Sequence, residues 1–210
     1  MVTANEQRFR ELLLDWGVGN TREYPWRETS RSLYEVFVAE FFLTQTPADN
    51  VASVYPQFTE QFPSLGSIDD ASKEELVEVI RPLGFYNMRA EALKEIATRC
   101  DSIPESVEDL TELPRVGRYI ANTTLCIAQN QPLPVLDRNV VRVYDRVFGE
   151  VWPAAESDQW EFTERLVPNE NPREYNLILL DFGAMICQSE PQCDVCFATE
   201  YCTYYQKHKQ

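Results

Sequence analysis

Apolar residues recur along most of this chain at intervals of three and four positions, the period of a helix buried on one side. Phe9, Leu12, Leu13 and Trp16 show this spacing near the start of the chain. The same pattern predicts helices at residues 33–44, 50–62, 73–80, 89–98, 118–129, 139–148, 160–166 and 175–186. Prolines fall mostly at or between these segments, and no alternating strand pattern persists. We therefore predict an all-α fold.

Length and composition indicate a folded, soluble protein. The chain has 210 residues, of which 44% are hydrophobic, which is enough for a sizeable core. No apolar run reaches the roughly 18–20 residues of a membrane helix. The first residues also lack the apolar core of a signal peptide. We expect a cytoplasmic protein with no membrane partner.

The charge is strongly negative, with 19 Lys and Arg against 34 Asp and Glu, a formal net charge of −15. Taken alone, this balance argues against binding to nucleic acid, whose phosphates attract cationic surfaces. An alternative is a surface adapted to high salt, as in a halophilic archaeon, and the presence of only four lysines fits it. The segment from residue 113 to residue 149 contains five arginines and only two acidic residues. This local positive segment predicts a binding face, unless the arginines cluster by chance.

Four of the six cysteines lie close together near the end of the chain. Cys187, Cys193, Cys196 and Cys202 follow the spacing C-x5-C-x2-C-x5-C. In an intracellular protein such a cluster indicates metal binding rather than disulfides. The spacing is compatible with a [4Fe–4S] cluster or with a tetrahedral zinc ion, in either case as a structural element.

A short segment with glycine joins the helix that ends near Leu110 to the helix that begins near Arg118. A hairpin of this kind points backbone N–H groups away from a helix N-terminus, which is a geometry that binds phosphate. Arg115 and Arg118 would add positive charge beside Val116 and Gly117. Many tight turns look similar, so the hairpin alone is a weak signal.

Two carboxyl groups stand in unlike surroundings. Asp137 directly precedes an amphipathic helix, where an N-cap is its expected structural role. Glu40 shares a helical face with Val36, Phe37 and Leu43, and it would either pair with a buried arginine or serve as a general acid. Two carboxyl groups in different environments are what the hydrolysis of a glycosidic bond requires.

Together these motifs resemble the helix-hairpin-helix (HhH-GPD) DNA glycosylases of the endonuclease III superfamily. The resemblance runs from the Tyr-Pro-Trp-Arg segment at 24–27 to Cys202, and it is closest to the branch of adenine and archaeal mismatch thymine glycosylases. It implies two lobes, with DNA bent across the cleft between them. One lobe would be the central helical domain at 28–134, with the hairpin at about 105–129. The other would combine residues 1–27 and 135–210 and carry a [4Fe–4S] cluster on the 187–202 loop.

The resemblance also implies roles for single residues. Asp137 matches the essential aspartate, and Glu40 matches the acid that helps the departing base to accept a proton. Asn139 and Tyr119 match residues that orient Asp137 and contact the flipped nucleotide. Gln45 and Phe85 match side chains that wedge into the duplex as the base leaves. The hairpin residues match phosphate contacts: Arg115, Val116, Gly117 and Arg118.

Tyr119 bears on the reaction type, because relatives that also cleave the strand carry a lysine at this position for Schiff-base chemistry. A phenol cannot form a Schiff base, so we expect a monofunctional glycosylase. We also expect it to be a monomer and to act on double-stranded DNA. Thymine or uracil opposite guanine is the favoured substrate. Adenine opposite guanine or 8-oxoguanine is the alternative. A non-catalytic iron–sulfur protein that binds or senses damaged DNA is the alternative of another class.

Three features depart from the family pattern. The first gap between cysteines is one residue shorter, and that loop contains no basic residue. In addition, Arg115 replaces the first glycine of the hairpin. A residue other than glycine in a left-handed conformation there would cost about 1–2 kcal/mol. All three features weaken the expected binding to DNA more than they affect the expected fold.

Overall fold

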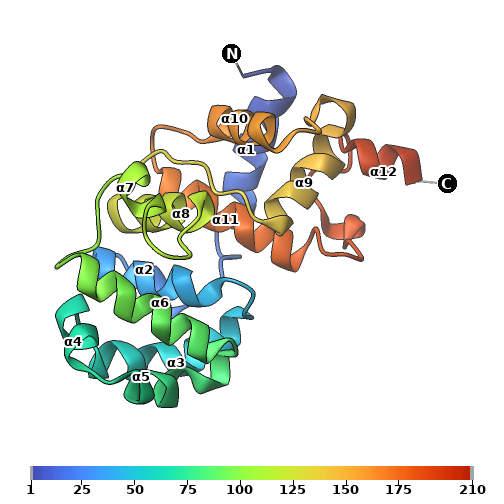
Figure 1. The fold of residues 1–210 in the computed structure, drawn as a ribbon. Coiled ribbons are helices and arrows are strands. Elements are labelled where there is room, and N and C mark those ends of the chain that lie inside the picture. Colours follow the sequence, from blue (N-terminus) through green and yellow to red (C-terminus); the bar gives the residue numbers. More distant parts are fainter. Residues whose placement is uncertain (1, 209–210) are drawn as a thin grey trace. The chain divides into compact units, whose positions relative to one another are not determined.

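The computed structural model describes residues 2–208, and the regular secondary structure in that range is entirely helical (Figure 1). This confirms the predicted all-α fold. No helix within residues 2–208 is long and apolar enough to cross a membrane. The chain divides into two compact units, which are described separately below. The central unit is Glu23–Gln129, and the terminal unit combines Met1–Arg22 with Asn130–Gln210.

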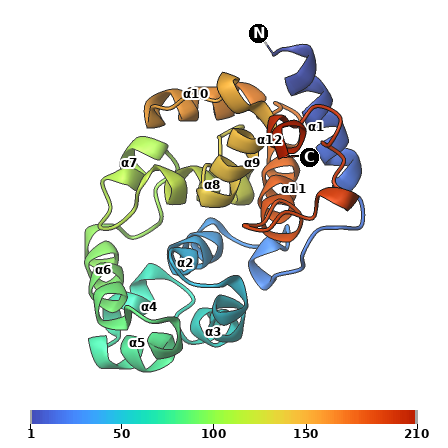
Figure 2. The ribbon, with the colours of Figure 1, turned by 90° about the vertical axis from the view of Figure 1, so that its right-hand side faces the viewer.

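The central unit is built around helix α2, Leu33–Leu43, which packs against α3 and α8 (Figure 2). Every residue from Val36 to Phe42 is buried, so this helix has no solvent-facing side along that stretch. A second group forms where α6 packs against α4 and α5. The remaining α-helices of the unit are α3 Ala48–Gln61, α4 Leu65–Asp70, α5 Lys73–Ile80, α6 Tyr86–Arg99, α7 Val107–Thr111 and α8 Arg118–Gln129.

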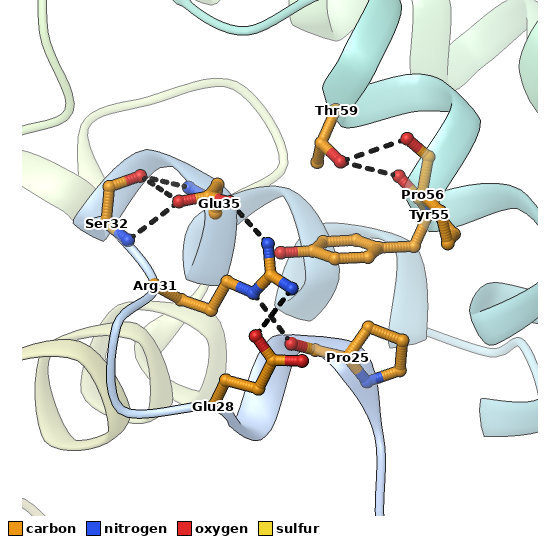
Figure 3. A network of polar contacts seen from close by, with 8 residues as sticks. All are labelled: Pro25, Glu28, Arg31, Ser32, Glu35, Tyr55, Pro56 and Thr59. Atoms are coloured by element: carbon orange, nitrogen blue, oxygen red, sulfur yellow. Dashed lines mark hydrogen bonds and ion pairs between the residues drawn. The ribbon is translucent and has the colours of Figure 1, made fainter.

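A polar network fixes the start of α2 (Figure 3). Ser32 and Glu35 form a capping box, in which the Ser32 Oγ accepts from the Glu35 N–H and Glu35 accepts from the Ser32 N–H. Arg31 donates to Glu35 at 2.9 Å, to Glu28 at 2.8 Å and to the Pro25 carbonyl at 2.8 Å. Because one guanidinium joins the preceding segment to the first turn of α2, the helix enters the core at a fixed position.

The terminal unit encloses an aromatic core. Phe9 of α1, Ala4–Gly17, makes edge contacts with Tyr144 and Phe148 of α9, Arg138–Phe148. Helix α11 packs against both α1 and α9, and the buried Asp181 on α11 pairs with Arg22 at 2.6 Å. The other helices of the unit are α10 Glu156–Leu166, α11 Pro172–Met185 and α12 Thr203–His208.

The observed helices extend beyond the predicted ones mainly at their polar first turns. Helix α10 begins at Glu156 rather than 160, and α11 begins at Pro172 rather than 175. First turns carry few apolar residues, so hydrophobic spacing does not mark them. The short helices α4 and α12 were not predicted, because six residues hold fewer than two full turns of the pattern.

Candidate active site and cysteine loop

Asp137 is the N-cap of α9, as predicted. Its Oδ1 accepts hydrogen bonds from the backbone N–H groups of Asn139 and Val140, both at 2.8 Å. Its Oδ2 accepts from the Asn139 side-chain amide, also at 2.8 Å. The cap bonds hold the half-buried carboxyl group in one orientation at the end of a helix.

Asn139 is in turn fixed from two sides. Its Oδ1 accepts from Arg142 at 2.9 Å, which orients the amide so that its N–H group faces Asp137. Gly183 of α11 packs closely behind it, since a Cβ on that glycine would lie 3.0 Å from the Asn139 Cβ. The structure therefore brings Asp137 and Asn139 together, and Arg142 and Gly183 support them.

Glu40 lies near the end of α2 in the central unit, with 2% of its surface exposed. The sequence placed it on one apolar helical face, whereas the structure buries every residue from Val36 to Phe42. Glu40 and Asp137 belong to different units, and the predicted partnership between them stays a prediction.

The predicted hairpin occupies residues 112–117, between α7 and α8. Val116 is buried and its N–H donates to the Leu113 carbonyl at 3.1 Å, whereas Arg115 and Gly117 are exposed. Arg115 has φ +63°, the left-handed conformation expected where the family has glycine. A Cβ on Gly117 would meet nothing within 4 Å, so the backbone beside the α8 N-terminus is open to approach.

Two further predicted contact residues lie in the central unit. Gln45 follows α2 and Phe85 precedes α6, and both have exposed side chains. Phe85 is 56% exposed, which is unusual for an aromatic residue. Tyr119 lies in the first turn of α8 and is half-buried.

The charges of the four cysteines act on one another. Burial raises the pKa of the Cys196 thiol to about 11, and the charges of Cys187, Cys202 and Cys193 act in the same direction. The donor set of four thiols therefore suits a cluster or a soft metal ion. Within residues 2–208, no three His, Cys, Asp or Glu side chains are already arranged to hold a metal ion.

Two arginines of the predicted positive segment make hydrogen bonds within the protein. Arg142 donates to the carbonyls of Gly183 at 2.8 Å and Cys187 at 2.7 Å. Arg146 donates to the carbonyls of Gln188 and Ser189, the latter at 2.9 Å. These two arginines therefore order the cysteine loop, and the binding face of the positive segment stays a prediction. The exposed members of the segment are Arg115, Arg118 and Arg138.

Sequence reasoning also passed over Arg89, which is 4% exposed and donates to the backbone at the end of α2. One signal was available. Arg89 lies four residues before Leu93 and seven before Ile96, on the apolar face of α6.

Comparison with known proteins identifies relatives along almost the entire chain. The model of the HhH-GPD superfamily base excision DNA repair proteins matches residues 38–166. The thymine/uracil-DNA glycosylase of Pyrobaculum aerophilum is 34% identical, over 97% of this chain and 94% of that protein. The solved structure of a thermostable thymine-DNA glycosylase superposes with a TM-score of 0.92 at 31% identity, covering 97% of both chains.

An adenine DNA glycosylase of Mycobacterium tuberculosis is also 34% identical, over 88% of this chain but 64% of its own length. The range matched by the family model, residues 38–166, contains Glu40, the hairpin, Asp137 and Asn139. The likeness to the solved thymine-DNA glycosylase extends through both units. The chain belongs to the HhH-GPD superfamily of base excision DNA repair proteins.

Proposed function

We propose that this protein is a monofunctional DNA glycosylase that removes thymine or uracil mispaired with guanine. The observation that carries the proposal is the Asp137 carboxylate, held at the start of α9 by two backbone N–H groups and oriented by the Asn139 amide. The full-length likeness to thymine and thymine/uracil glycosylases supports the choice of base.

Asp137 is the group that faces the sugar in this proposal. Cleavage of an N-glycosidic bond builds positive charge on the sugar ring, and a fixed carboxylate stabilises that charge and directs water to the anomeric carbon. The hydrogen bond from Asn139 keeps Oδ2 in place without any rearrangement during the reaction. Asn139 therefore acts through Asp137, as a positioning residue.

Glu40 supplies the proton for the departing base. Its carboxyl group is 2% exposed, on the stretch of α2 where every residue is buried, and a carboxyl group placed beside a reacting base can act as a general acid. Tyr119 provides a phenol where a lysine would be needed for a Schiff base, so the product is an intact strand with an abasic site.

DNA binding rests on the hairpin and the two exposed turns. A phosphate would bind at the N-terminus of α8, where the helix dipole favours negative charge, beside the exposed Arg115 and Arg118. Gln45 and Phe85 are the side chains that enter the duplex when the target nucleotide leaves the stack. Direct electrostatic attraction is weak for a chain of net charge −15, so shape and flipping contribute much of the affinity.

We propose that Cys187, Cys193, Cys196 and Cys202 hold a [4Fe–4S] cluster. When bound, it would order a loop that has little apolar core of its own. Arg142 and Arg146 already fix the first part of this loop through the carbonyls of residues 187–189. Iron and acid-labile sulfide, each at about four per chain with visible absorbance, are expected for the purified protein. Stoichiometric zinc without sulfide would contradict the cluster.

A panel of duplexes tests the choice of base. Single-turnover reactions would use G·T, G·U, A·G and A opposite 8-oxoguanine, each read with and without alkali. We expect thymine and uracil release, with strand breaks appearing only after alkali treatment. Release of adenine alone would replace the proposed substrate by the adenine alternative, and breaks without alkali would contradict the monofunctional assignment. A protein that binds these duplexes but releases no base would be the non-catalytic alternative.

A further inference from the structure

Two exposed turns of the central unit hold Gln45 and Phe85 in left-handed backbone conformations, with φ +58° and φ +49°. Side chains other than Gly, Asn and Asp rarely adopt this region, and each such residue costs energy. Such strain persists only where the surrounding structure over-determines the backbone. We therefore ask which contacts enforce these two backbone conformations, and what the strained turns do for the protein.

Arg89 fixes the turn that contains Gln45. Its guanidinium donates to the carbonyls of Phe42 at 2.7 Å and Phe41 at 3.3 Å, in the last turn of helix α2. Its Nη2 also donates to the Thr44 carbonyl at 2.8 Å and the Thr46 hydroxyl at 2.7 Å. Capping the end of α2 explains the first two bonds. The other two hold the residues on either side of Gln45.

Thr46 connects this turn to the turn that contains Phe85. Its buried hydroxyl accepts from Arg89 and donates to the Leu83 carbonyl at 3.1 Å. A hydroxyl has one hydrogen to donate, so this bond and the one it accepts form a directed relay between the turns. Gly84, at φ +72°, and then Phe85 follow directly, and the Phe85 carbonyl accepts from the Arg89 N–H at 3.0 Å.

We propose that Arg89 and Thr46 are positioning residues that hold Gln45 and Phe85 as one preformed pair for entry into the duplex. This inference rests on the proposed function, because it needs a nucleotide that leaves the stack. Two side chains already projecting from strained turns lose little conformational freedom when they fill the vacated space. Without the relay, each turn relaxes toward negative φ, and the side chains no longer project together.

The test compares three single substitutions in the full chain. Thr46→Val removes the relay with little change in shape, and Thr46→Ser restores the hydroxyl. Thr163→Val is the matched control, because Thr163 is fully buried and its hydroxyl makes one bond, to the Gln159 carbonyl at 2.8 Å, in the terminal unit. Thermal unfolding of each variant confirms that it is folded before any DNA measurement.

Extrusion of the base is read separately from its release. A G·T duplex would carry 2-aminopurine beside the target thymidine and a 2′-fluorine on the target sugar, which disfavours charge build-up and blocks release. We expect Thr46→Val to slow the fluorescence rise, and base release from the ordinary duplex, about tenfold. Thr46→Ser is expected to recover most of both rates, and Thr163→Val to match the wild type.

Arg89→Lys extends the test without removing the charge. One ammonium cannot reach the four oxygens that the guanidinium contacts, so we expect slower extrusion here as well. A folded Thr46→Val variant with the wild-type extrusion rate would overturn the positioning role alone. A wild-type protein that neither extrudes nor releases the base would overturn the proposed function, and the positioning role with it.

Discussion

Two glutamates within residues 2–208 are almost completely buried, and we assign them different roles. Glu40 is 2% exposed and is the proposed proton donor. Glu6 is 1% exposed and pairs with Arg165 at 2.7 Å in the terminal unit. Burial alone would raise the Glu6 pKa, but hydrogen bonds from the Thr3 N–H and Arg165 lower it below its usual value. Glu6 is therefore held charged as a structural group.

This difference predicts that two glutamine substitutions affect different quantities: one lowers the reaction rate, and the other lowers the stability. Glu40→Gln should lower the single-turnover rate by roughly 100-fold or more, because the amide cannot donate a proton to the base. Glu6→Gln should lower the free energy of unfolding by about 1–3 kcal/mol, because Arg165 loses its charged acceptor, and leave the rate unchanged. Rates and urea unfolding would be measured on both. Equal rate losses in the two variants would contradict the assignment.

Arg115 combines a charge with a strained backbone, and two substitutions separate these effects. Arg115→Gly removes both the charge and the strain at φ +63°, whereas Arg115→Ala removes only the charge. We expect the glycine variant to be more stable than the alanine variant by about 1 kcal/mol. Both should bind DNA more weakly than the wild type, and to the same extent. Salt-dependent binding and thermal unfolding measure the two quantities.

Sequence reasoning succeeded at residues whose role follows from a local pattern. Asp137 precedes an amphipathic helix, and it is the N-cap of α9. Arg115 stands where the hairpin needs a left-handed residue, and its φ is positive. It did not foresee the loop contacts of Arg142 and Arg146, because their acceptors lie 41 to 45 residues away in sequence. A local count of charge cannot identify such partners.

At the scale of elements, the packing of α11 against α9 sets the orientation of Asn139. A Cβ at Gly183 would lie 3.0 Å from the Asn139 Cβ and 3.3 Å from Val143 Cγ2, so Gly183→Ala should displace Asn139 by a few tenths of an ångström. We expect about a tenfold loss of rate. Gly17→Ala is the control, because its Cβ would collide with Ile178 at 2.2 Å in the same unit.

The control should lose stability rather than activity. Overpacking at Gly17 is expected to cost about 1–3 kcal/mol of unfolding free energy, with the single-turnover rate unchanged below the melting temperature. A Gly183→Ala variant with full activity would contradict the view that α11 supports the site.

Capping boxes make helix stability sensitive to acid. Burial alone would raise the pKa of Glu35, but hydrogen bonds from the Ser32 N–H and Arg31 lower it below the ordinary value of 4.5. A carboxyl group whose pKa is lower in the folded than in the unfolded state stabilises the fold above pH 4.5. That contribution is lost as the pH falls through the folded-state pKa.

Glu35→Gln should therefore show a smaller loss of stability between pH 5 and pH 3 than the wild type. Glu78→Gln, an exposed position on α5, controls for the change in net charge. Urea unfolding midpoints at each pH give the comparison. Identical pH profiles for the two variants would show that the Ser32–Glu35 box does not carry the acid sensitivity.

Hydrophobic spacing located the long helices but not their partners. The spacing predicted a helix with one apolar face at α2, whereas its seven consecutive buried residues follow from the packing of α3 and α8 around it. Likewise, Arg89 reads as an ordinary cation in α6 until the end of α2 and the Thr46 turn are placed beside it. Periodicity specifies an element, whereas its neighbours come from contacts between distant segments.

At the scale of the whole molecule, the order of the motifs carried more information than the overall charge. A net charge of −15 argued against nucleic acid, whereas Glu40, the hairpin, Asp137 and the cysteine loop occur in the order of one repair family. The thymine/uracil-DNA glycosylase and the solved thymine-DNA glycosylase each match 97% of this chain, so the likeness does not depend on one motif. The charge then describes how DNA would be bound, rather than whether it is bound.

The most direct test of the proposed chemistry is a comparison of Asp137→Asn with the wild type on a G·T duplex under single-turnover conditions. Asparagine also caps helices well, so the variant should fold with an unchanged melting temperature. Asp145→Asn, an exposed position on the same helix, is the matched control for charge. We predict thymine release by the wild type and by Asp145→Asn, and a loss of at least about 100-fold for Asp137→Asn. A folded Asp137→Asn variant that releases thymine at the wild-type rate would contradict the assignment of Asp137.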